Sequence, residues 1–277
     1  MLRILLNALR TGVVTTRYPA VPSVPPDRFR GAPLLRPGSH LPPASVCPAG
    51  AISEHFDHDR RSVALDLARC VFCGRCAEDP WADAIAMGRD FELAARSRDD
   101  MRIEVIADDP AGAAVGRTPD PDMQSARASS EIKRVLGRSL HVRHLDAGSC
   151  NACDWELTAL LNPVYDVRRL GIDFVASPRH ADGVVVTGPV TRNLETAVRR
   201  TVEAIPEPRV VIAVGACAAS GGIVGVGYAS AGGVDQILPV DVYIPGCPPR
   251  PEAILFGILV AVGRLDARRA SSLLQST

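Results

Sequence analysis

The sequence predicts an α/β fold for the second half of the chain, because apolar strand candidates alternate with helix candidates after Arg138. Continuous apolar runs, such as that from Val210 to Val214, are typical of parallel strands that are covered on both faces. A doubly wound, flavodoxin-like parallel sheet is the most economical arrangement of these elements. The strand candidates are Leu140–Leu145, Ile172–Ala176, Gly183–Thr187, Arg209–Val214 and Val240–Ile244, and the helix candidates are Trp155–Arg169, Thr191–Ile205 and Pro251–Leu265.

The 277 residues divide into five predicted segments. Residues 1–45 comprise an amphipathic helix candidate and a proline-rich arm, and residues 46–87 form a compact cysteine-bearing unit. Residues 88–138 are polar and interrupted by Pro and Gly, which predicts a linker with one short strand candidate at Arg102–Ala107. Residues 139–266 hold the α/β domain, and residues 267–277 form a tail.

The composition excludes several classes of protein. With 31 basic and 31 acidic side chains the net charge is zero, so no long-range field attracts nucleic acid or an anionic membrane. No stretch approaches the ~20 apolar residues that cross a bilayer, so we expect a chain that is not integral to a membrane. One face of the first predicted helix is apolar and holds Leu2, Leu5, Leu6 and Leu9. We expect this face to pack on a neighbouring subunit, which is favoured over its lying in a lipid interface.

Four cysteines of the α/β half follow strand candidates. Cys150 and Cys153 come after the first strand, Cys217 after the fourth and Cys247 after the last. Because the carboxyl ends of parallel strands lie at one edge of a sheet, the four thiolates are expected to meet there. Soft thiolates suit an iron–sulfur cluster or zinc. A cluster is favoured over structural zinc, which usually has two short hairpin pairs, and over unliganded thiols, which fit poorly between Pro and Gly.

The other four cysteines lie near the N-terminus. Cys70-Val-Phe-Cys73-Gly-Arg-Cys76 is the C-x2-C-x2-C core of a bacterial ferredoxin loop. In two-cluster ferredoxins the fourth ligand is a Cys-Pro from the other motif, and Cys47-Pro has this form. We therefore predict a 4Fe-4S site from Cys47, Cys70, Cys73 and Cys76, with a zinc knuckle as the alternative. Eight cysteines in such patterns favour a reducing compartment over disulfides.

Four segments of the second half resemble the small, cluster-bearing subunit of nickel–iron hydrogenases and its homologue, the B-type subunit of complex I. They are Cys150-Asn-Ala-Cys153-Asp-Trp-Glu156, Ser177 to Arg192, Gly215 to Gly222, and Pro245-Gly-Cys-Pro-Pro-Arg-Pro-Glu252. The complex I homologue carries two adjacent cysteines in the first motif, whereas this chain has C-x2-C. The resemblance is therefore greatest to the energy-converting, formate hydrogenlyase-like group.

The N-terminal part resembles the ferredoxin-like subunit of the same complexes, in the run from Leu9 to Pro19 and in Phe29-Arg-Gly. That subunit normally holds two clusters, whereas here the first C-x2-C-x2-C is replaced by the cysteine-free run from Ser39 to Ser45. The resemblance implies that a reduced, ferredoxin-like α+β iron–sulfur domain is fused to the hydrogenase-type domain. The whole chain is then expected to hold two 4Fe-4S clusters.

The resemblance further implies an electron-transfer subunit of a membrane-associated energy-converting nickel–iron hydrogenase or formate hydrogenlyase-like complex. Its expected partners are a hydrogenase-type large subunit and further iron–sulfur and membrane subunits, on the cytoplasmic face of the cell membrane. The catalytic centre is expected on the partner, since no residue here is a candidate acid, base or nucleophile. The alternatives are a complex I-like NADH/ferredoxin:quinone oxidoreductase B-type subunit and, in another class, a zinc-stabilised scaffold protein.

Three residues other than the cysteines are candidates for supporting roles at the C-terminal site. Glu156 could aid proton or partner coupling, but a carboxylate favoured by the helix dipole explains it equally well. The resemblance places Arg179 near the large subunit, with the cysteine loops. Trp155 is expected to be a buried contact with that subunit or, equally, a core residue.

Overall fold

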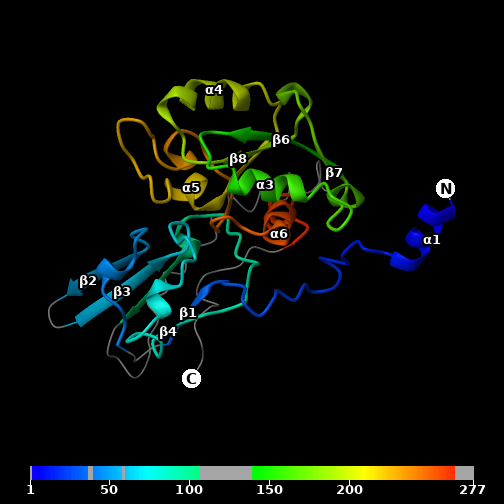
Figure 1. Ribbon diagram of the computed structural model, residues 1–277. Helices are drawn as coiled ribbons and strands as arrows, with labels where there is room; N and C mark the ends of the chain where they lie inside the picture. Colours follow the sequence, from blue (N-terminus) through cyan, green and yellow to red (C-terminus); the bar gives the residue numbers. More distant parts are fainter. Residues whose placement is uncertain (1, 37–39, 58–59, 107–138, 266–277) are drawn as a thin grey trace.

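The computed structural model describes residues 2–36, 40–57, 60–106 and 139–265 (Figure 1). The second half contains a five-stranded parallel sheet with the order β10-β9-β8-β6-β7. Its first strand along the chain, β6, lies between the second and third strands, which is the strand order of flavodoxin-like folds. The predicted doubly wound sheet is confirmed. The strands are β6 (Leu140–Asp146), β7 (Ile172–Phe174), β8 (Gly183–Thr187), β9 (Val210–Val214) and β10 (Val242–Ile244).

Helices cover both faces of this sheet, as the apolar strands require. Helix α4 (Arg192–Glu203) buries Val198 against Val184 and Val186 on one face. Helices α3 (Ala152–Ala159) and α6 (Pro251–Ala261) pack with Val185 on the other face. Figure 1 shows α4 on the opposite side of the sheet from α3 and α6. The short helix α5 (Gly215–Ser220) continues directly from β9 and contacts β8, β9 and β10.

Helix α3 is shorter than its predicted range, which extended to Arg169. The helix ends at Ala159, and the Asn162 side chain then accepts hydrogen bonds from the backbone N–H groups of Val164 (2.8 Å) and Tyr165 (3.1 Å). This turn competes with a helix, and Pro163 has no N–H to continue one. The chain therefore reverses after α3 and reaches β7 through a short 3-10 helix.

The N-terminal half forms two antiparallel sheets. One pairs β2 (Ile52–Asp57), β3 (Arg60–Asp66) and β5 (Arg102–Ile106), and the other pairs β1 (Pro33–Leu35) with β4 (Ile85–Met87). The ferredoxin-like nature of this part stays a prediction. The 3-10 helices among the described residues are η1 (Ala44–Val46), η2 (Arg75–Ala77), η3 (Asp99–Met101), η4 (Val167–Leu170), η5 (Pro178–His180) and η6 (Val234–Gln236).

The segment from Gly88 to Ile106, predicted as part of a linker with one strand candidate at Arg102–Ala107, is folded: the strand candidate corresponds to β5 (Arg102–Ile106), and the residues before it also pack into the fold. Strand β5 alternates apolar and charged residues, so that Ile103 and Val105 are buried while Arg102 is exposed. This apolar face, with Met101, completes the core of the three-stranded sheet. The rest of the predicted linker, 107–138, and the predicted tail, 267–277, lie outside the described residues.

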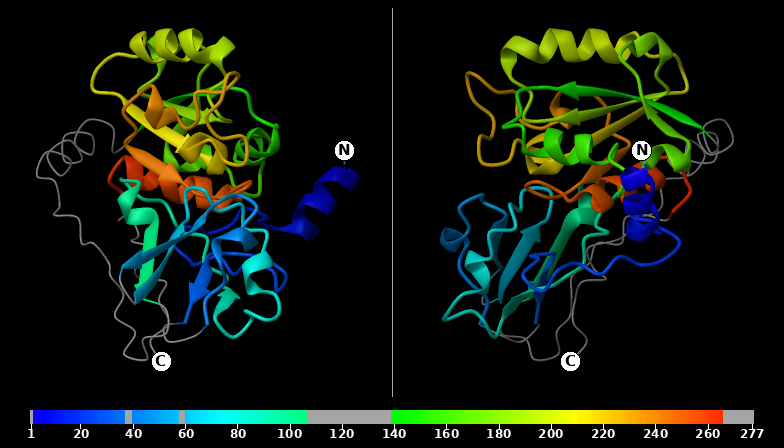
Figure 2. Two further views of the ribbon diagram at one scale, coloured as in Figure 1. Left: turned by 90° about the vertical axis from the view of Figure 1, so that its left-hand side faces the viewer. Right: turned by 45° about the vertical axis from the view of Figure 1, so that its right-hand side comes forward.

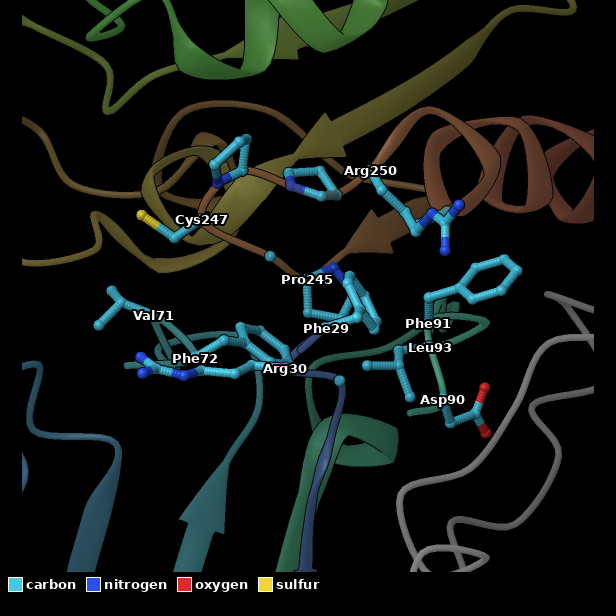
Figure 3. Close-up of a pocket in the computed structure, with 15 residues that line it drawn as sticks. Phe29, Arg30, Val71, Phe72, Asp90, Phe91, Leu93, Pro245, Cys247 and Arg250 are labelled. Carbon is cyan, nitrogen blue, oxygen red and sulfur yellow. The ribbon is translucent and has the colours of Figure 1, made fainter. Parts of the chain in front are cut away.

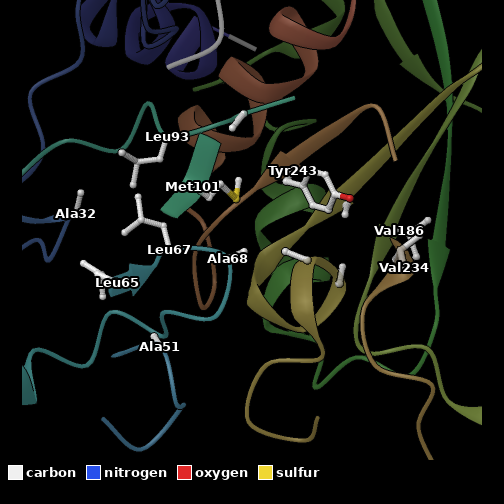
Figure 4. Close-up of a cluster of buried hydrophobic side chains, with 14 of the residues drawn as sticks. Ala32, Ala51, Leu65, Leu67, Ala68, Leu93, Met101, Val186, Val234 and Tyr243 are labelled. Carbon is white, nitrogen blue, oxygen red and sulfur yellow. The ribbon is translucent and has the colours of Figure 1, made fainter. Parts of the chain in front are cut away.

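The two halves share a continuous buried cluster, in which Leu65, Leu67 and Met101 of the first half lie with Tyr243 of the second (Figure 4). Ala95 pairs with Tyr243 through two backbone hydrogen bonds of 3.0 and 2.8 Å. This bridge covers the edge strand β10 of the parallel sheet. The two halves are thus packed against each other, as both views in Figure 2 show.

Helix α1 (Leu2–Thr11) extends away from this body (Figures 1 and 2). The side chains of Ile4, Leu6 and Leu9 are exposed. Its packing on a neighbouring subunit stays a prediction.

Candidate iron–sulfur sites

The sheet brings the four C-terminal cysteines to one edge. Cys150 and Cys153 follow β6, Cys217 lies in α5 directly after β9, and Cys247 follows β10. Burial raises the pKa of the Cys153 thiol well above its usual range, and the neighbouring thiols of Cys217, Cys247 and Cys150 raise it further. Each thiol thus lies close enough to influence another, as the strand ends predict. Cys153 is buried, Cys217 is half-buried, and Cys150 and Cys247 are exposed.

Two loops at this edge approach each other so closely that glycine is required. Gly215 has φ +87°, and a Cβ atom there would lie 2.6 Å from the sulfur of Cys153. The next residue, Ala216, donates its N–H to the carbonyl of Gly246 at 2.8 Å. The loop after β9 is therefore bonded to the loop after β10 and leaves room for a cysteine from the loop after β6.

Asp154 holds the Cys150–Cys153 loop over the point where the strand order reverses. Its carboxylate accepts a hydrogen bond from Thr187 at the end of β8 (2.7 Å), lies 2.7 Å from Nε2 of His144 in β6, and accepts the hydroxyl of Ser149. Burial raises the pKa of this carboxyl, but the hydrogen bonds from Ser149 and Thr187 and the charge of His144 outweigh burial and lower it overall. Asp154 is thus held as a carboxylate that links β6, β8 and the cysteine loop.

The four N-terminal cysteines line one small, apolar cavity of about 20 Å³. Burial raises the pKa of Cys70 to about 12, and the thiols of Cys76, Cys47 and Cys73 add to this effect, against the N–H of Phe72. Burial raises the pKa of Cys76 to about 11. The predicted quartet is therefore brought together although 22 residues separate Cys47 from Cys70 along the chain.

Backbone N–H groups point at two of these sulfurs. Ala51 donates to Sγ of Cys47 at 3.2 Å, and Phe72 donates to Sγ of Cys70 at 3.4 Å. Hydrogen bonds to the sulfurs are one of the means by which a protein sets the potential of an iron–sulfur cluster. Four thiols around an apolar cavity, with N–H groups aimed at the sulfurs, are a donor set that fits such a cluster.

A single zinc ion is the alternative to a cluster at each quartet. Within the described residues, no three His, Cys, Asp or Glu side chains converge tightly enough to hold one ion. The four ligands of a zinc ion all lie within about 2.3 Å of it, whereas the cysteines of a four-iron cluster bind separate corners. The cluster and the zinc ion both stay predictions.

An ion pair stabilises the cysteine-free run from Leu41 to Ala44. Arg61 donates to the carbonyls of Leu41 (3.2 Å) and Pro42 (3.3 Å), and it pairs with Glu54 at 2.7 Å. The same Glu54 carboxylate accepts the N–H of Ala44 at 3.2 Å. Side-chain hydrogen bonds from Arg61 and to Glu54 thus hold the run from Leu41 to Ala44 in place.

A cleft of about 160 Å³ separates the two quartets (Figure 3). Val71 and Phe72 of the first cysteine loop line both this cleft and the cavity of the N-terminal quartet. Cys247 and Pro248 line the cleft from the other half of the chain. The two predicted sites therefore lie on either side of a single boundary between the halves.

The structure corrects the prediction for Arg179, which was expected with the cysteine loops. Arg179 lies in η5, before β8 begins, and nearby Asp182 is bonded to His141 at the start of β6. Loops that precede parallel strands lie at the edge opposite the loops that follow them. Arg179 is therefore exposed at the far edge of the sheet, away from the cysteines.

The other two candidates lie near the cysteines. Trp155 is 74% exposed, so the alternative that it belongs to the core is wrong, and its contact with a partner stays a prediction. Glu156 is half-buried. Burial is the main cause that raises the pKa of its carboxyl, the negative charge of Glu252 raises this pKa further, and the positive charge of Arg250 lowers it in part. Sequence reasoning missed Asp154, for which its position beside Cys153 was the only available signal.

Comparison with known proteins agrees with this fold and these motifs. The family described as NADH ubiquinone oxidoreductase, 20 Kd subunit, matches residues 150–261. The probable membrane-bound hydrogenase subunit mbhJ of Pyrococcus furiosus is 46% identical over 136 residues, which are 49% of this chain and 81% of that protein. Formate hydrogenlyase subunit 7 of Escherichia coli is 44% identical over 157 residues, 57% of this chain and 61% of that protein.

An NADH-quinone oxidoreductase subunit of Geotalea daltonii is 45% identical over 119 residues, which are 43% of this chain and 69% of that protein. These identities extend over more than two thirds of the length of two of the three relatives. The chain therefore belongs to the family of the NADH ubiquinone oxidoreductase 20 Kd subunit. Among the described helices, none has the length and apolar character that crossing a bilayer requires.

Proposed function

We propose that this chain is the electron-transfer subunit of a membrane-associated, energy-converting hydrogenase or formate hydrogenlyase-like complex, and that it holds two 4Fe-4S clusters. The observation that carries the proposal is the gathering of all eight cysteines into two quartets on either side of one cleft. Bound clusters would supply one-electron redox chemistry at both places. The names of the hydrogenase and formate hydrogenlyase relatives support the choice of complex.

The residues of the chain hold and insulate the sites rather than catalyse a reaction. The C-terminal site consists of Cys150, Cys153, Cys217 and Cys247, and the N-terminal site of Cys47, Cys70, Cys73 and Cys76. Burial raises the pKa of Cys217 to about 11, and five of the eight thiols have raised pKa values altogether. Since ligation needs thiolates, loading the sites releases protons and is favoured as the pH rises.

A separate large subunit is the proposed location of the catalytic centre. It would cover the loops of the C-terminal quartet, where Trp155 and the loop side chains Ile223, Val224 and Val226 are more than 60% exposed. Exposed apolar patches of this kind mark protein interfaces. The membrane association is then indirect, through partner subunits, on the cytoplasmic face.

The test of the proposal is the iron content of anaerobically purified protein. Two clusters predict about eight irons and eight acid-labile sulfides per chain. Cys47→Ser should abolish the N-terminal cluster or convert it to a three-iron form, and leave the spectrum of the C-terminal cluster unchanged. Cys217→Ser should disrupt the C-terminal cluster and leave the spectrum of the N-terminal cluster unchanged. Ser45→Ala is the matched control, because Ser45 lies two residues from Cys47 but is not a proposed cluster ligand. Four irons per chain in the unaltered protein would contradict the two-cluster proposal, and colourless, zinc-containing protein would contradict a redox role.

A complex I-like B-type subunit is the second candidate, supported by the NADH-quinone oxidoreductase relative. The two candidates differ in the large subunit that associates with this chain. Co-purification with a nickel-containing large subunit would support the hydrogenase, and reduction of quinone by the assembled complex would support the alternative.

A further inference from the structure

The side chain of Arg250 sits on the boundary between the two halves. It lies three residues after Cys247, directly before helix α6. Its guanidinium carbon lies 4.8 Å from the ring centroid of Phe91 and 5.3 Å from that of Phe29. Figure 3 shows the guanidinium lying over Phe91, with the cleft beside it. A cation in this position is attracted to both rings.

Glu252 fixes the orientation of this guanidinium. Nε and one terminal nitrogen of Arg250 donate to the two oxygens of Glu252, at 2.8 and 2.7 Å. The Glu252 side chain is only 4% exposed, and it also accepts the hydroxyl of Ser23 at 3.1 Å. A bidentate pair in such surroundings has one defined geometry. It therefore joins the start of α6 to the N-terminal arm that carries Ser23 and Phe29.

The contacts continue from this arm to the other quartet. Arg30, which follows Phe29, donates to the carbonyl oxygen of Cys73 at 2.6 Å. The path from one quartet to the other is therefore short: three residues of backbone from Cys247 to Arg250, the contact with Phe29, and the hydrogen bond from Arg30 to Cys73. All these residues except Cys73 line the cleft between the halves.

We propose that Arg250 is a positioning residue that sets the separation of the two cysteine quartets, and so the electron transfer between them. Arg250, held by Glu252, keeps Phe29 and Phe91 packed against the Cys247 loop. Arg30, the residue after Phe29, fixes the Cys73 loop through its hydrogen bond to the Cys73 carbonyl. Electron tunnelling falls steeply with distance, so a clamp that fixes the distance between the Cys247 and Cys73 loops, within halves already joined by the shared core, has a direct effect on it. The inference rests on the proposed function, because it requires clusters in both quartets.

The test uses the magnetic interaction of the two clusters in the purified full-length protein. When both clusters are reduced, their unpaired spins split and broaden each other's electron paramagnetic resonance signals, and this interaction decays with the cube of the distance. Arg250→Ala should reduce the splitting while iron content and the absorption spectrum stay those of two clusters. Arg250→Lys keeps a cation beside Glu252, and so protects the fold, but a lysine cannot form the bidentate, stacked contact. This variant should also reduce the splitting.

The matched control is Arg199→Ala. Arg199 also pairs with a glutamate, Glu195, at 3.0 Å, but it lies on α4, on the far face of the sheet. This variant should keep the splitting of the unaltered protein. Arg30→Ala, which breaks the second link, should reduce the splitting as Arg250→Ala does.

The outcomes separate the two proposals. Unchanged splitting in Arg250→Ala, Arg250→Lys and Arg30→Ala, with two clusters present, would overturn the positioning role alone. Two clusters without any splitting in the unaltered protein would also overturn it, because the quartets would not be held close. A single cluster per chain would overturn the proposed function and this inference together.

Discussion

Replacement of Gly215 by alanine tests how the C-terminal quartet is built. Gly215 has φ +87°, a conformation that costs an alanine about 1–2 kcal/mol. In addition, its new Cβ would lie 2.6 Å from the sulfur of Cys153, where ordinary contacts begin at 3.4 Å. Either the sulfur or the start of α5 must move by roughly 1 Å, and overpacking of this kind costs about 1–3 kcal/mol.

The matched control is Gly225→Ala. Gly225 also has a positive φ, +66°, but a Cβ atom there would meet nothing within 4 Å. This variant therefore has the backbone strain of the first without the steric contact. We expect a loss of about 1–2 kcal/mol for Gly225→Ala and about 2–5 kcal/mol for Gly215→Ala. Chemical denaturation of the iron-free chains measures this difference.

Iron binding gives the second measurement on the same variants. Moving Cys153 away from the other three thiols should lower the iron content of the Gly215→Ala chain by about four irons, if one of two four-iron clusters is lost. Gly225→Ala should keep the full content. Equal stability and equal iron content of the two variants would refute the close approach of Gly215 to Cys153, and with it the arrangement of the loops after β6 and β9.

Three further predictions concern residues around the sites. Asp154→Ala should destabilise the chain by about 1–3 kcal/mol, since the Thr187 hydroxyl loses its acceptor. It should also speed the loss of the cluster from the C-terminal site in the presence of a chelator. An unchanged cluster lifetime would contradict the role of Asp154 in linking β6, β8 and the cysteine loop. Trp155→Ala should change the unfolding free energy by less than about 0.5 kcal/mol and weaken the affinity for the large subunit by about 2 kcal/mol or more, as titration calorimetry would measure; a large loss of stability with unchanged affinity would be the opposite result. Burial raises the pKa of Asp241 despite the N–H of Val211, so the stability that this carboxyl contributes is complete below its unfolded pKa of about 4 and is lost as the pH rises through its folded pKa. Asp241→Asn should therefore gain stability relative to the unaltered chain as the pH rises above about 4 in urea denaturation, and a pH-independent difference would contradict this assignment.

The sequence by itself determined the sheet and the grouping of the cysteines. The strand candidates were recognisable because a parallel strand buried on both faces needs an unbroken apolar run, such as Val210 to Val214. The position of Cys217 and Cys247 just after strand candidates placed them at one edge, because all strands of a parallel sheet end there. Local patterns were sufficient for these conclusions.

Only the tertiary structure decided how the halves meet. Arg250 and Phe29 are 221 residues apart, and no periodicity or motif connects a stacked arginine with a distant ring. The exposure of Trp155 and the folding of the segment that contains Met101 likewise depend on what packs against them, which local sequence does not specify. The position of Arg179 also depends on the tertiary structure. Arg179 belongs to one of the four segments that resemble the hydrogenase subunit, but it lies just before β8, and so at the edge of the sheet opposite the cysteines.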